Sequence, residues 1–492
     1  MNVNPITRLD YPDPDVIRVE DTYYMVSTTM HFMPGCEILQ SFDLVHWEHV
    51  TYVYETLDHT DAQQLKSGQN IYGQGMWAAS LRYHEGRFCI CFVANDTRKT
   101  YLYTSEKIDG PWKKQLIEGF YHDGSLLFDE DGRNYIVYGN DEIWITELNE
   151  DLTAPKKDGL HRLLVSDHKN PELGYEGSHI QKINGYYYIF LIHSLRDRWM
   201  RTEACFYSDS LEGEFTGGDV LCDDRGYCGQ GVAQGGIVDT PDGKWYAMLF
   251  QDSGAVGRIP ILLPVTWKDH FPFFGQNGHV PEEIEVHSTR PGYIYQPLVG
   301  SDDFCNGLLP RWQFNHDPDP RYYHLDALQG TYTITTREVC TELTQAVNTL
   351  TQRMSYPSCA AEVTVDASAL KEGDVAGLCA LQSCYAAVGI TKHHGKYEVL
   401  MLDKKEDGIL DMTEGTVVES HQMDFRLEAD FCNMKDEARC YYRVNKGDWL
   451  PIGTVHKLYF KLDHFTGCRF GLFCYAAEET GGSACFRDFK YY

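Results

Sequence analysis

Three acidic segments of the sequence set a carboxylate in a tight turn that would hold its side chain rigidly. They are Tyr11-Pro12-Asp13-Pro14-Asp15, His122-Asp123-Gly124-Ser125 and Tyr175-Glu176-Gly177-Ser178-His179. Two carboxyl groups facing each other across a sugar can cleave a glycosidic bond, because one protonates the leaving oxygen while the other activates water or attacks the anomeric carbon. Each segment alone predicts only a turn, since Pro presets φ and Asp caps its own backbone. Whether the three carboxylates form one site therefore depends on the fold that positions these segments.

Length and composition predict a multidomain all-β protein. The 492 residues exceed one ordinary core, which indicates two or three domains. Aromatic residues make up 13% of the chain and 43 Gly separate short apolar runs, a profile typical of many strands and turns. The net charge of -29, without clustered Lys and Arg, argues against nucleic acid and anionic membranes as partners and suits a neutral substrate.

The N-terminal residues and the cysteines bear on the cellular compartment. The segment Met1-Asn2-Val3-Asn4-Pro5 has no basic or apolar region of a secretory signal, and no apolar run reaches the length of a membrane helix. We therefore expect a cytoplasmic protein. The 16 Cys are scattered, mostly in apolar strand-like runs, without paired zinc-ligand spacing. Buried reduced thiols are the favoured interpretation, and a disulfide framework is the alternative that spacing leaves open.

A repeated pattern organises the first part of the chain. An aromatic-rich strand after a Gly or Asp turn recurs at residues 21–26, 86–90, 132–137, 185–190 and 243–248. A second marker, Ser followed by aliphatic and aromatic residues, occurs at 41–47, 105–112 and 208–215 and indicates an outer turn. The spacing is near that of four-stranded propeller blades. Residues 1–290 are therefore predicted to form five similar blades, with a run of unrelated hairpins as the alternative.

The blade markers end at a linker. Pro291 and Pro297 bracket a stretch that reads as a linker over residues 291–300. Residues 301–492 keep strand character, with two-residue alternation and closely spaced polar turns. This pattern favours a β-sandwich as the C-terminal domain.

Several motifs occur together and in order along the chain. The N-terminal ones are Asn4-Pro5, residues 11–18, Asp43-Leu44-Val45-His46-Trp47, Gly75-Met76-Trp77-Ala78, Asp123-Gly124-Ser125-Leu126, Asp131-Gly132, Glu176-Gly177-Ser178-His179 and residues 240–246. The C-terminal ones are Asp302-Asp303-Phe304, Trp312-Gln313-Phe314-Asn315, Leu350-Thr351-Gln352-Arg353 and residues 373–378. The first set resembles glycoside hydrolase family 43, and the second resembles the β-sandwich appended to its β-xylosidase-like members. The resemblance covers nearly the whole chain.

The resemblance implies a five-bladed propeller whose central pocket hydrolyses pentosides with inversion. By motif, Asp13 resembles the general base that activates water, Glu176 the general acid, and Asp123 the residue that tunes and orients that acid. An inverting pair stands roughly 6.5 to 9.5 Å apart to leave room for water. Glu176 must carry a proton near neutral pH while Asp13 stays ionised, and Asp123 could supply the neighbouring negative charge. We expect Asp15, Asp129 and Asp131 to be structural.

Substrate contacts follow from the same resemblance. Trp77 resembles an apolar wall of the sugar pocket, with a core Trp as the alternative. Arg258 matches an Arg that clamps sugar hydroxyls and holds the base ionised. The segment Met30-His31-Phe32 lies where the family places pocket-lining groups, although His31 could equally be structural.

The chain departs from the family pattern at two places. Trp77-Ala78-Ala79-Ser80 replaces the frequent Trp-Ala-Pro, and Ala233-Gln234-Gly235-Gly236 replaces a Gly-His-Gly-Ser type motif whose His often sits beside a central calcium. Gln234 could offer a carbonyl oxygen to calcium. We expect no required cofactor and keep calcium at Gln234 as an open alternative.

The implied activity is the exo-acting release of a terminal pentose from short xylo-oligosaccharides or arabinosylated oligosaccharides. β-D-Xylosyl groups are the first expectation, and α-L-arabinofuranosidase as the main activity is the alternative. Two rivals come from other classes: a non-catalytic carbohydrate-binding propeller and a retaining, fructosidase-like propeller. A homo-oligomer formed through the sandwich would suit the family.

Overall fold

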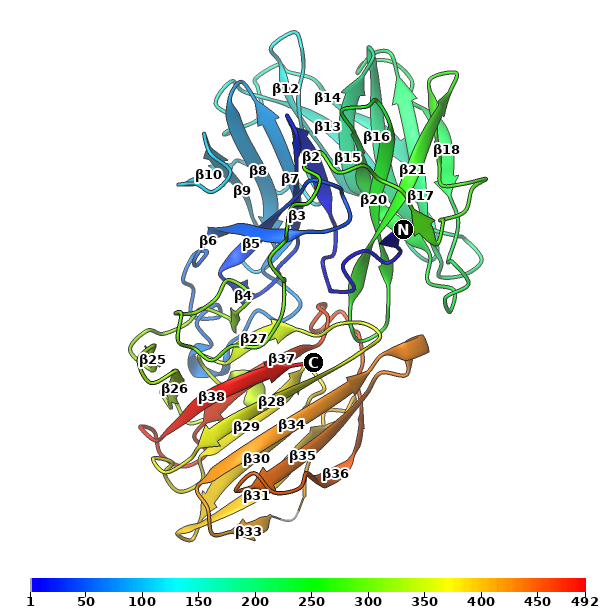
Figure 1. Cartoon of the computed structure of the whole chain (residues 1–492). Helices are drawn as coiled ribbons and strands as arrows, with labels where there is room; N and C mark the ends of the chain where they lie inside the picture. The colour runs from blue at the N-terminus through cyan, green and yellow to red at the C-terminus, as the bar shows by residue number, and fades with distance from the viewer. Residues whose placement is uncertain (1, 414) are drawn as a thin grey trace.

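The protein is all-β and consists of two bodies stacked end to end (Figure 1). This computed structural model describes residues 2–413 and 415–492. Besides strands, these residues form three short 3-10 turns, η1 (Lys66–Gly68), η2 (Leu343–Gln345) and η3 (Cys432–Met434). None of the described helices has the length and apolar character needed to cross a bilayer. The predicted all-β class is confirmed.

Five four-stranded antiparallel sheets make up the N-terminal body, a five-bladed β-propeller. Blade I comprises β2 (Asp15–Val19), β3 (Thr22–Ser27), β5 (Gly35–Ser41) and β6 (Glu48–Tyr54). Blade II comprises β7 (Met76–His84), β8 (Arg87–Ala94), β9 (Lys99–Ser105) and β10 (Lys113–Ile117). Blade III comprises β11 (Ser125–Phe128), β12 (Asn134–Asn140), β13 (Glu142–Leu148) and β14 (His161–Ser166). Blade IV comprises β15 (Glu176–Ile183), β16 (Tyr186–Ser194), β17 (Arg201–Ser208) and β18 (Thr216–Leu221). Blade V comprises β19 (Val232–Asp239), β20 (Trp245–Asp252), β21 (Arg258–Lys268) and β22 (Phe271–Phe274).

The first strands of the blades surround the propeller axis. They contact one another in a closed ring of β2, β7, β11, β15 and β19. The five aromatic repeats predicted from the sequence are the second strands, β3, β8, β12, β16 and β20, each entered through a hairpin. A second strand is covered by neighbouring blades on both faces, so nearly every side chain of β8 and β16 is buried. The aromatic repeat in the sequence therefore marks the second strand of each blade, which is packed on both faces.

The second sequence marker is the turn between the third and fourth strands of blades I, II and IV. In each case a Ser hydroxyl oxygen accepts the amide N–H of the residue two positions later: Asp43 to Ser41 at 3.1 Å, Lys107 to Ser105 at 3.2 Å and Ser210 to Ser208 at 3.3 Å. Ser favours such turns because its hydroxyl replaces a backbone acceptor. The predicted outer turn is thus one local device used three times.

The ring is closed by the N-terminal segment. Strand β1 (Asn2–Val3) pairs with β23 (Glu283–Ile284), which follows blade V. The Asn4 side chain donates to the carbonyl of Leu262 at 2.7 Å and accepts the Leu262 amide at 3.1 Å. Arg18 of blade I pairs with Asp239 of blade V at 2.5 Å. The first and last blades are therefore fastened at several points.

The C-terminal body is a β-sandwich of two antiparallel sheets. The larger sheet has the order β32 (Leu410–Met412), β31 (Lys396–Lys404), β30 (Ala386–His393), β29 (Val375–Leu381), β37 (Arg469–Tyr475), β27 (Leu350–Arg353), β24 (Gln313–Asn315) and β4 (Phe32–Met33), with β33 (Thr416–Val418) also pairing with β31. The smaller sheet has the order β25 (Tyr323–Asp326), β26 (Thr331–Thr335), β38 (Ser483–Tyr491), β28 (Ser358–Asp366), β34 (Gln422–Asp430), β35 (Glu437–Val444) and β36 (Leu450–Lys457).

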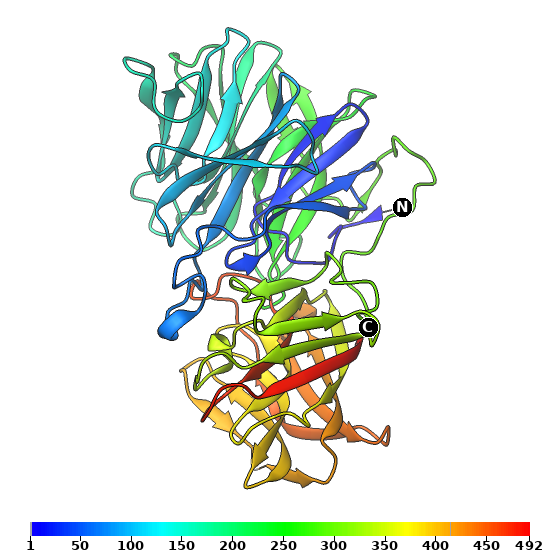
Figure 2. The same ribbon diagram turned by 90° about the vertical axis from the view of Figure 1, so that its left-hand side faces the viewer.

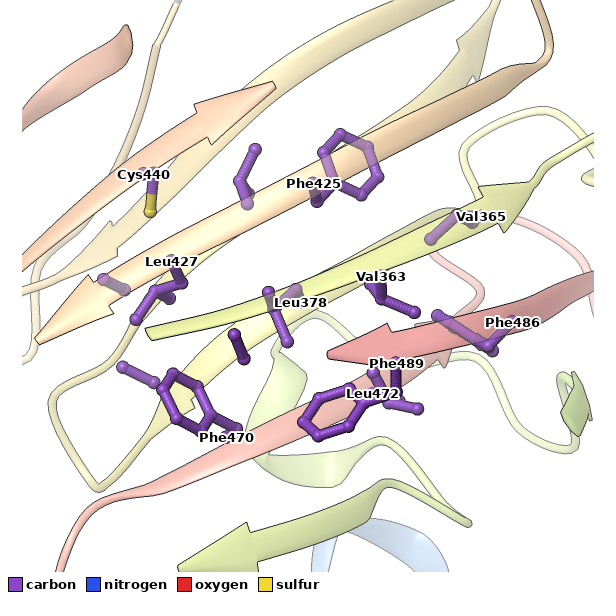
Figure 3. Packing of buried hydrophobic residues seen from close by; sticks show 14 of the residues in the cluster. Val363, Val365, Leu378, Phe425, Leu427, Cys440, Phe470, Leu472, Phe486 and Phe489 are labelled. Carbon is purple, nitrogen blue, oxygen red and sulfur yellow. The ribbon is translucent and has the colours of Figure 1, made fainter. Parts of the chain in front are cut away.

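A single apolar core lies between the two sheets. Figure 3 shows Phe470 and Leu472 of the larger sheet beside Val363, Phe425 and Phe486 of the smaller one. All five side chains are almost completely buried. This inward alternation is what the two-residue sequence pattern predicted. All 16 cysteines are free thiols, most of them buried in such cores.

One strand from the propeller segment belongs to the sandwich. Strand β4, between β3 and β5 of blade I, pairs with β24, with Phe32 opposite Asn315 and Met33 opposite Phe314. The Arg469 guanidinium lies 3.5 Å from the centre of the Phe32 ring. The two bodies therefore share a sheet, and they lie directly against each other in both views (Figures 1 and 2).

A buried ion pair joins the bodies beside this shared strand. Arg353 of β27 lies 2.8 Å from Glu37 of β5, and both side chains are almost fully buried. His49 contacts the other Glu37 oxygen at 3.0 Å. Burial works to raise the pKa of Glu37, but Arg353 and His49 outweigh it and hold that pKa at about 2. The interface thus contains a fully compensated buried charge.

Replacing Arg353 with Met should destabilise the whole molecule, because it leaves Glu37 buried without its guanidinium. We expect the free energy of unfolding in urea to fall by about 3 to 5 kcal/mol, and the double change with Glu37→Gln to recover part of it. The control is Arg290→Met, which breaks a half-exposed pair with Asp21 and should cost less than about 1 kcal/mol. Equal losses for both single variants would contradict a special role for the interface pair.

Candidate active site

A cavity of about 1020 Å³ lies where the propeller axis meets the sandwich. The predicted carboxylates Asp13, Asp123 and Glu176 all line it. Each stands at or just before the start of a first strand, β2, β11 and β15 respectively. Since the first strands form one ring, these starts meet at one end of the axis. Three segments far apart in the sequence therefore converge on a single pocket.

Irregular backbone at the start of the first strands orients the side chains there. The first strands β7, β15 and β19 each shift register near their beginning, next to Trp77, Gly177 and Gln234. Such bulges bend a strand and redirect a side chain. Gly177 has a φ of 65°, and a Cβ added there would lie 2.8 Å from the Gln234 side chain. Only glycine fits this close approach next to Glu176.

Asp13 is held by donors from two blades. It has a left-handed φ of 52° and is buried. The Thr28 hydroxyl donates to Asp13 Oδ2 at 2.6 Å, and Arg258 Nη1 donates to Oδ1 at 3.0 Å. Both carboxylate oxygens are therefore oriented, and the charge of Asp13 is compensated by the guanidinium.

Arg258 is itself fixed from both bodies. Its backbone N–H donates to Asp10 Oδ1 at 2.7 Å, and its guanidinium lies 4.4 Å from the centre of the Phe465 ring of the sandwich. The structure thus places Arg258 against Asp13, as the sequence analysis expected, and stacks it on an aromatic side chain.

Asp123 lies between the other two carboxylates and a histidine. Its Oδ2 accepts the amide of Gly177 at 3.0 Å and lies 3.5 Å from His122 Nε2. Burial raises the pKa of Asp123 to about 6; His122 opposes that rise, whereas Glu176 and Asp13 add to it. Asp123 is therefore ionised at neutral pH and takes up a proton in mildly acidic solution.

His122 supplies the positive charge of this cluster. Burial alone would lower its pKa, but Asp123 and Glu176 raise that pKa to about 9. Its Nε2 lies 3.5 Å from Glu176 Oε2 as well. The imidazole therefore lies between the side chains of Asp123 and Glu176, at 3.5 Å from an oxygen of each. His122 belongs to one of the three acidic segments of the sequence, but no role was predicted for it.

Glu176 is the most exposed of the three carboxylates. It is the first residue of β15, with 18% of its side chain exposed, against 7% for Asp13 and for Asp123. Asn140 Nδ2 donates to Glu176 Oε2 at 2.6 Å. Both the amide and the imidazole contact Oε2, and among the described residues no hydrogen bond reaches Oε1. That oxygen is left to face a ligand in the cavity.

The predicted sugar contacts divide into two groups. Trp77 lines the cavity, with its ring 5.9 Å from His122 and 5.5 Å from Phe465. Met30, His31 and Phe32 are fully buried and are not among the lining residues. The reason is strand β4, which leads residues 32 and 33 away to the sandwich, while the Met30 backbone pairs with Met76. These three side chains therefore lie behind the wall that Trp77 presents.

Part of the cavity wall comes from the sandwich. Phe460, Lys461, Leu462 and Phe465 lie in the loop between β36 and β37 and reach the propeller axis. These four residues were not predicted from the sequence, because no local pattern connects this loop with the acidic motifs. Arg98, Phe120 and Trp199 of the propeller rim were missed for the same reason.

The propeller axis below the cavity is occupied by a guanidinium. Arg82 donates to Asp15 Oδ2 at 2.8 Å, to Ser125 Oγ at 2.8 Å and to the carbonyls of Leu126 at 2.8 Å and Ile180 at 3.2 Å. These acceptors belong to blades I, III and IV. A protein cation thus binds the oxygen atoms that converge on the axis. Asp15 is structural, as expected.

The two remaining acidic positions are also accounted for. Asp129 accepts from Lys182 at 2.6 Å and from the Tyr187 hydroxyl at 2.5 Å, and Asp131 pairs with Arg133 in the hairpin turn. Both stabilise blade structure, as the sequence analysis expected.

Gln234 does not find the partners that calcium requires. Its backbone amide donates to Glu203 at 2.7 Å, and Glu203 is the one carboxylate that contacts it among the described residues. Calcium takes six to eight oxygen ligands, and the other axial oxygens bind Arg82. The residues at Gln234 therefore do not fit calcium. A group that could hold a metal ion is His122, Asp123 and Glu176, whose ligand atoms lie within 4.8 Å of one another.

Comparisons with known proteins identify the family of both bodies. The model described as glycosyl hydrolases family 43 matches residues 3–272, and that of the beta xylosidase C-terminal concanavalin A-like domain matches residues 301–492. A beta-xylosidase of Formosa agariphila is 26% identical over 98% of this chain and 88% of its own length. A xylosidase/arabinosidase of Humicola insolens is 25% identical over 99% of this chain and 96% of its own.

Two solved structures extend the likeness. A bifunctional GH43-CE protein of Bacteroides eggerthii is 42% identical, with a TM-score of 0.93 over 100% of this chain and 63% of that one. This chain thus spans less than two thirds of that bifunctional protein. A GH43 glycoside hydrolase engineered to display both endo-xylanase and exo-arabinofuranosidase activity is 27% identical, with a TM-score of 0.87 over 100% and 99% of the two chains.

The pH dependence of kcat/KM on the acidic side should reflect the ionisation of Asp123 next to His122. Because Asp123 ionises near pH 6, activity that needs its negative charge is present above that pH and lost as pH falls through it. Since the His122 imidazolium lowers the pKa of Asp123, His122→Asn should move the acidic limb of kcat/KM upward by about 1 pH unit. The measurement is aryl pentoside hydrolysis between about pH 4.5 and 9.5, a range that brackets the titration of both groups. The exposed His161→Asn serves as control, and an unchanged limb in His122→Asn would refute the coupling.

Proposed function

The chain belongs to glycosyl hydrolase family 43, and we propose that it is an exo-acting, inverting enzyme that releases a terminal pentose from short plant-derived oligosaccharides. It is a glycosidase of the β-xylosidase and α-L-arabinofuranosidase type. The observation that carries the proposal is the convergence of Asp13, Asp123 and Glu176 on one cavity. Their partners suit three separate roles.

In the proposed reaction Glu176 is the acid and Asp13 the base. Glu176 gives its proton to the glycosidic oxygen as the bond to the anomeric carbon breaks. Asp13 takes a proton from a water molecule, whose oxygen attacks the anomeric carbon from the opposite face. The products are a free pentose of inverted configuration and the shortened oligosaccharide. Asp13 ends protonated and Glu176 ionised, so one proton must return through solvent before the next turnover.

The neighbours of each group support this division. Arg258 and Thr28 hold Asp13 as an oriented carboxylate. The His122 imidazolium lies next to the Glu176 oxygen and stabilises the negative charge that forms when the proton leaves. Asp123 contributes the opposite charge, which disfavours premature loss of that proton. The charges of His122 and Asp123 thus have opposite effects on the proton of Glu176.

The wall of the cavity supports an exo-acting enzyme. The loop between β36 and β37 places Phe465 against Trp77 in the cavity lining, with ring centres 5.5 Å apart. A cavity with a wall added by the sandwich suits a chain end, and the aromatic side chains suit the apolar face of a sugar ring. Related proteins are named as xylosidases and as xylosidase/arabinosidases. We propose β-D-xylosyl groups as the main substrate and α-L-arabinofuranosyl groups as the second candidate.

Replacing Glu176 with Gln tests the acid assignment. Hydrolysis of pentosides with poor leaving groups should fall by about 10²- to 10⁴-fold, because the leaving oxygen is no longer protonated. Aryl pentosides with acidic phenols need less protonation and should lose much less. The control is Glu212→Gln, at an exposed turn residue of blade IV. If Glu176→Gln left the hydrolysis of poor leaving groups at the parent level, a non-catalytic sugar-binding propeller would be favoured.

The stereochemistry and the substrate are decided by direct measurements. Proton NMR of the first-formed sugar should show the inverted anomer, and a retained anomer would identify the fructosidase-like alternative. Parallel assays of aryl xylosides, aryl arabinofuranosides and xylo-oligosaccharides rank the substrates. Activity restricted to internal bonds of long xylan would exclude the exo-acting proposal.

Metal removal should leave the enzyme active. Arg82 compensates Asp15 on the axis and binds the carbonyls there, so we propose that catalysis requires no calcium. Dialysis against EDTA is expected to change kcat/KM by less than about 2-fold and to leave the thermal midpoint unchanged, since an ion stabilises a fold only by binding to it. A loss that added calcium restores would contradict this proposal.

A further inference from the structure

Among the described residues that line the cavity, one Lys or Arg side chain has no carboxylate partner. Its lining includes the side chains of Arg98, Arg201, Arg258 and Lys461. Three of them are paired: Arg201 with Asp252 at 2.6 Å, Arg258 with Asp13 at 3.0 Å, and Lys461 with Glu406. Among the described residues Arg98 has no such pair, although the chain has 72 acidic and only 43 basic residues. In so acidic a protein, an uncompensated guanidinium in the pocket indicates a site for a ligand.

Arg98 is held rigidly in spite of its exposure. Its guanidinium lies 3.8 Å from the centre of the Phe120 ring, which also lines the cavity. Its backbone is left-handed, with a φ of 56°, and its N–H donates to the carbonyl of Ala94 at 3.0 Å. The amide of the nearby Asn95 donates to Gly75 at 3.1 Å. The position of Arg98 is therefore set by its backbone hydrogen bond and by the Phe120 ring.

We propose that Arg98 and Phe120 form a binding site for a carboxylate on the leaving-group side of the substrate, such as a uronic acid substituent carries. Stacking on Phe120 leaves the in-plane N–H groups of the guanidinium free, and their geometry matches a carboxylate bidentately. The guanidinium has five donors and no acceptor, and a carboxylate can accept from two of those donors at once with both of its oxygens, whereas a hydroxyl offers a single oxygen. This carboxylate site rests on the proposed function, because it binds the leaving-group end of the oligosaccharide substrate proposed above.

The side of the substrate follows from the neighbours of Arg98. Arg98 stacks on Phe120, which lies two residues before His122 in the chain, and all three residues line the cavity. His122 contacts Glu176, the acid that protonates the leaving oxygen. Asp13 and Arg258, on the side of the attacking water, form a separate pair. Arg98 is therefore on the side of the departing part of the oligosaccharide.

The test compares two ligands that differ only in the carboxylate. Aldobiouronic acid, a glucuronic acid joined to xylose, and its carboxyl-reduced form are used as competitive inhibitors of aryl pentoside hydrolysis by the full chain. We expect the acid to bind about 5-fold more tightly than the reduced form. The preference should shrink in about 0.5 M NaCl, because an exposed ion pair is screened. Free acetate as a third inhibitor separates recognition of the uronic acid from that of any small carboxylate.

Variants assign the preference to its residue. In Arg98→Gln the ratio of the two inhibition constants should fall to about 1, and in Arg98→Lys it should be intermediate, because the charge remains but the fork is lost. The control is Lys99→Gln, which removes the adjacent cation paired with Asp58 outside the cavity and should keep the full ratio. Circular dichroism and the thermal midpoint check that each variant folds.

Two results would overturn the inference. One is equal inhibition by the acid and the reduced form in the unaltered protein, and the other is an undiminished preference in Arg98→Gln. If acetate alone competed as well as the acid, the site would be one for small carboxylates and not for a uronic acid. Failure to hydrolyse any aryl pentoside would refute the proposed function, and calorimetry with the same two ligands would then still decide the carboxylate site.

Discussion

The structure depends on the compensation of buried negative charge at one end of the propeller axis. Asp13, Asp123 and Glu176 face one cavity, and burial together with mutual repulsion makes three ionised carboxylates costly there. Two cations resolve this: Arg258 on Asp13, and His122 between Asp123 and Glu176. Arg258 lies against Asp13, whereas His122 lies against both Asp123 and Glu176. The same compensation therefore lets three carboxyl groups share one cavity and gives them different neighbours.

The compensation also explains why the two bodies meet so closely. Asp10 accepts the amide of Arg258 and, at 2.8 Å, the amide of Gly467 from the sandwich. A Cβ on Gly467 would lie 2.7 Å from Asp10, and one on Gly257 would lie 2.3 Å from it. Glycine is thus required on both sides of this carboxylate. The Glu37 and Arg353 pair and strand β4 continue the same interface, so the sandwich sets the position of Arg258 and Phe465 with respect to the axis.

The sequence was most informative where one residue type has one physical use. Aromatic second strands recur because each is packed on both faces, and they located all five blades. The turns holding Asp13, Asp123 and Glu176 also came together, since each precedes or begins a first strand. Local patterns could not reveal that β4 leaves its blade, and Met30, His31 and Phe32 were therefore expected in the pocket. Phe465 and the charge of His122 depend on neighbours distant in sequence, which a single sequence does not identify.

Strand β4 has a consequence for the order in which the protein can mature. Its partner β24 begins at Gln313, and the aromatic wall of the cavity includes Phe465, which is synthesised much later. During synthesis the five blades emerge first, but blade I keeps an unpaired strand and the cavity stays open on one side until nearly the last residues leave the ribosome. A propeller without the residues after Gln313 would therefore lack both the partner of β4 and the part of the cavity wall that the loop between β36 and β37 supplies.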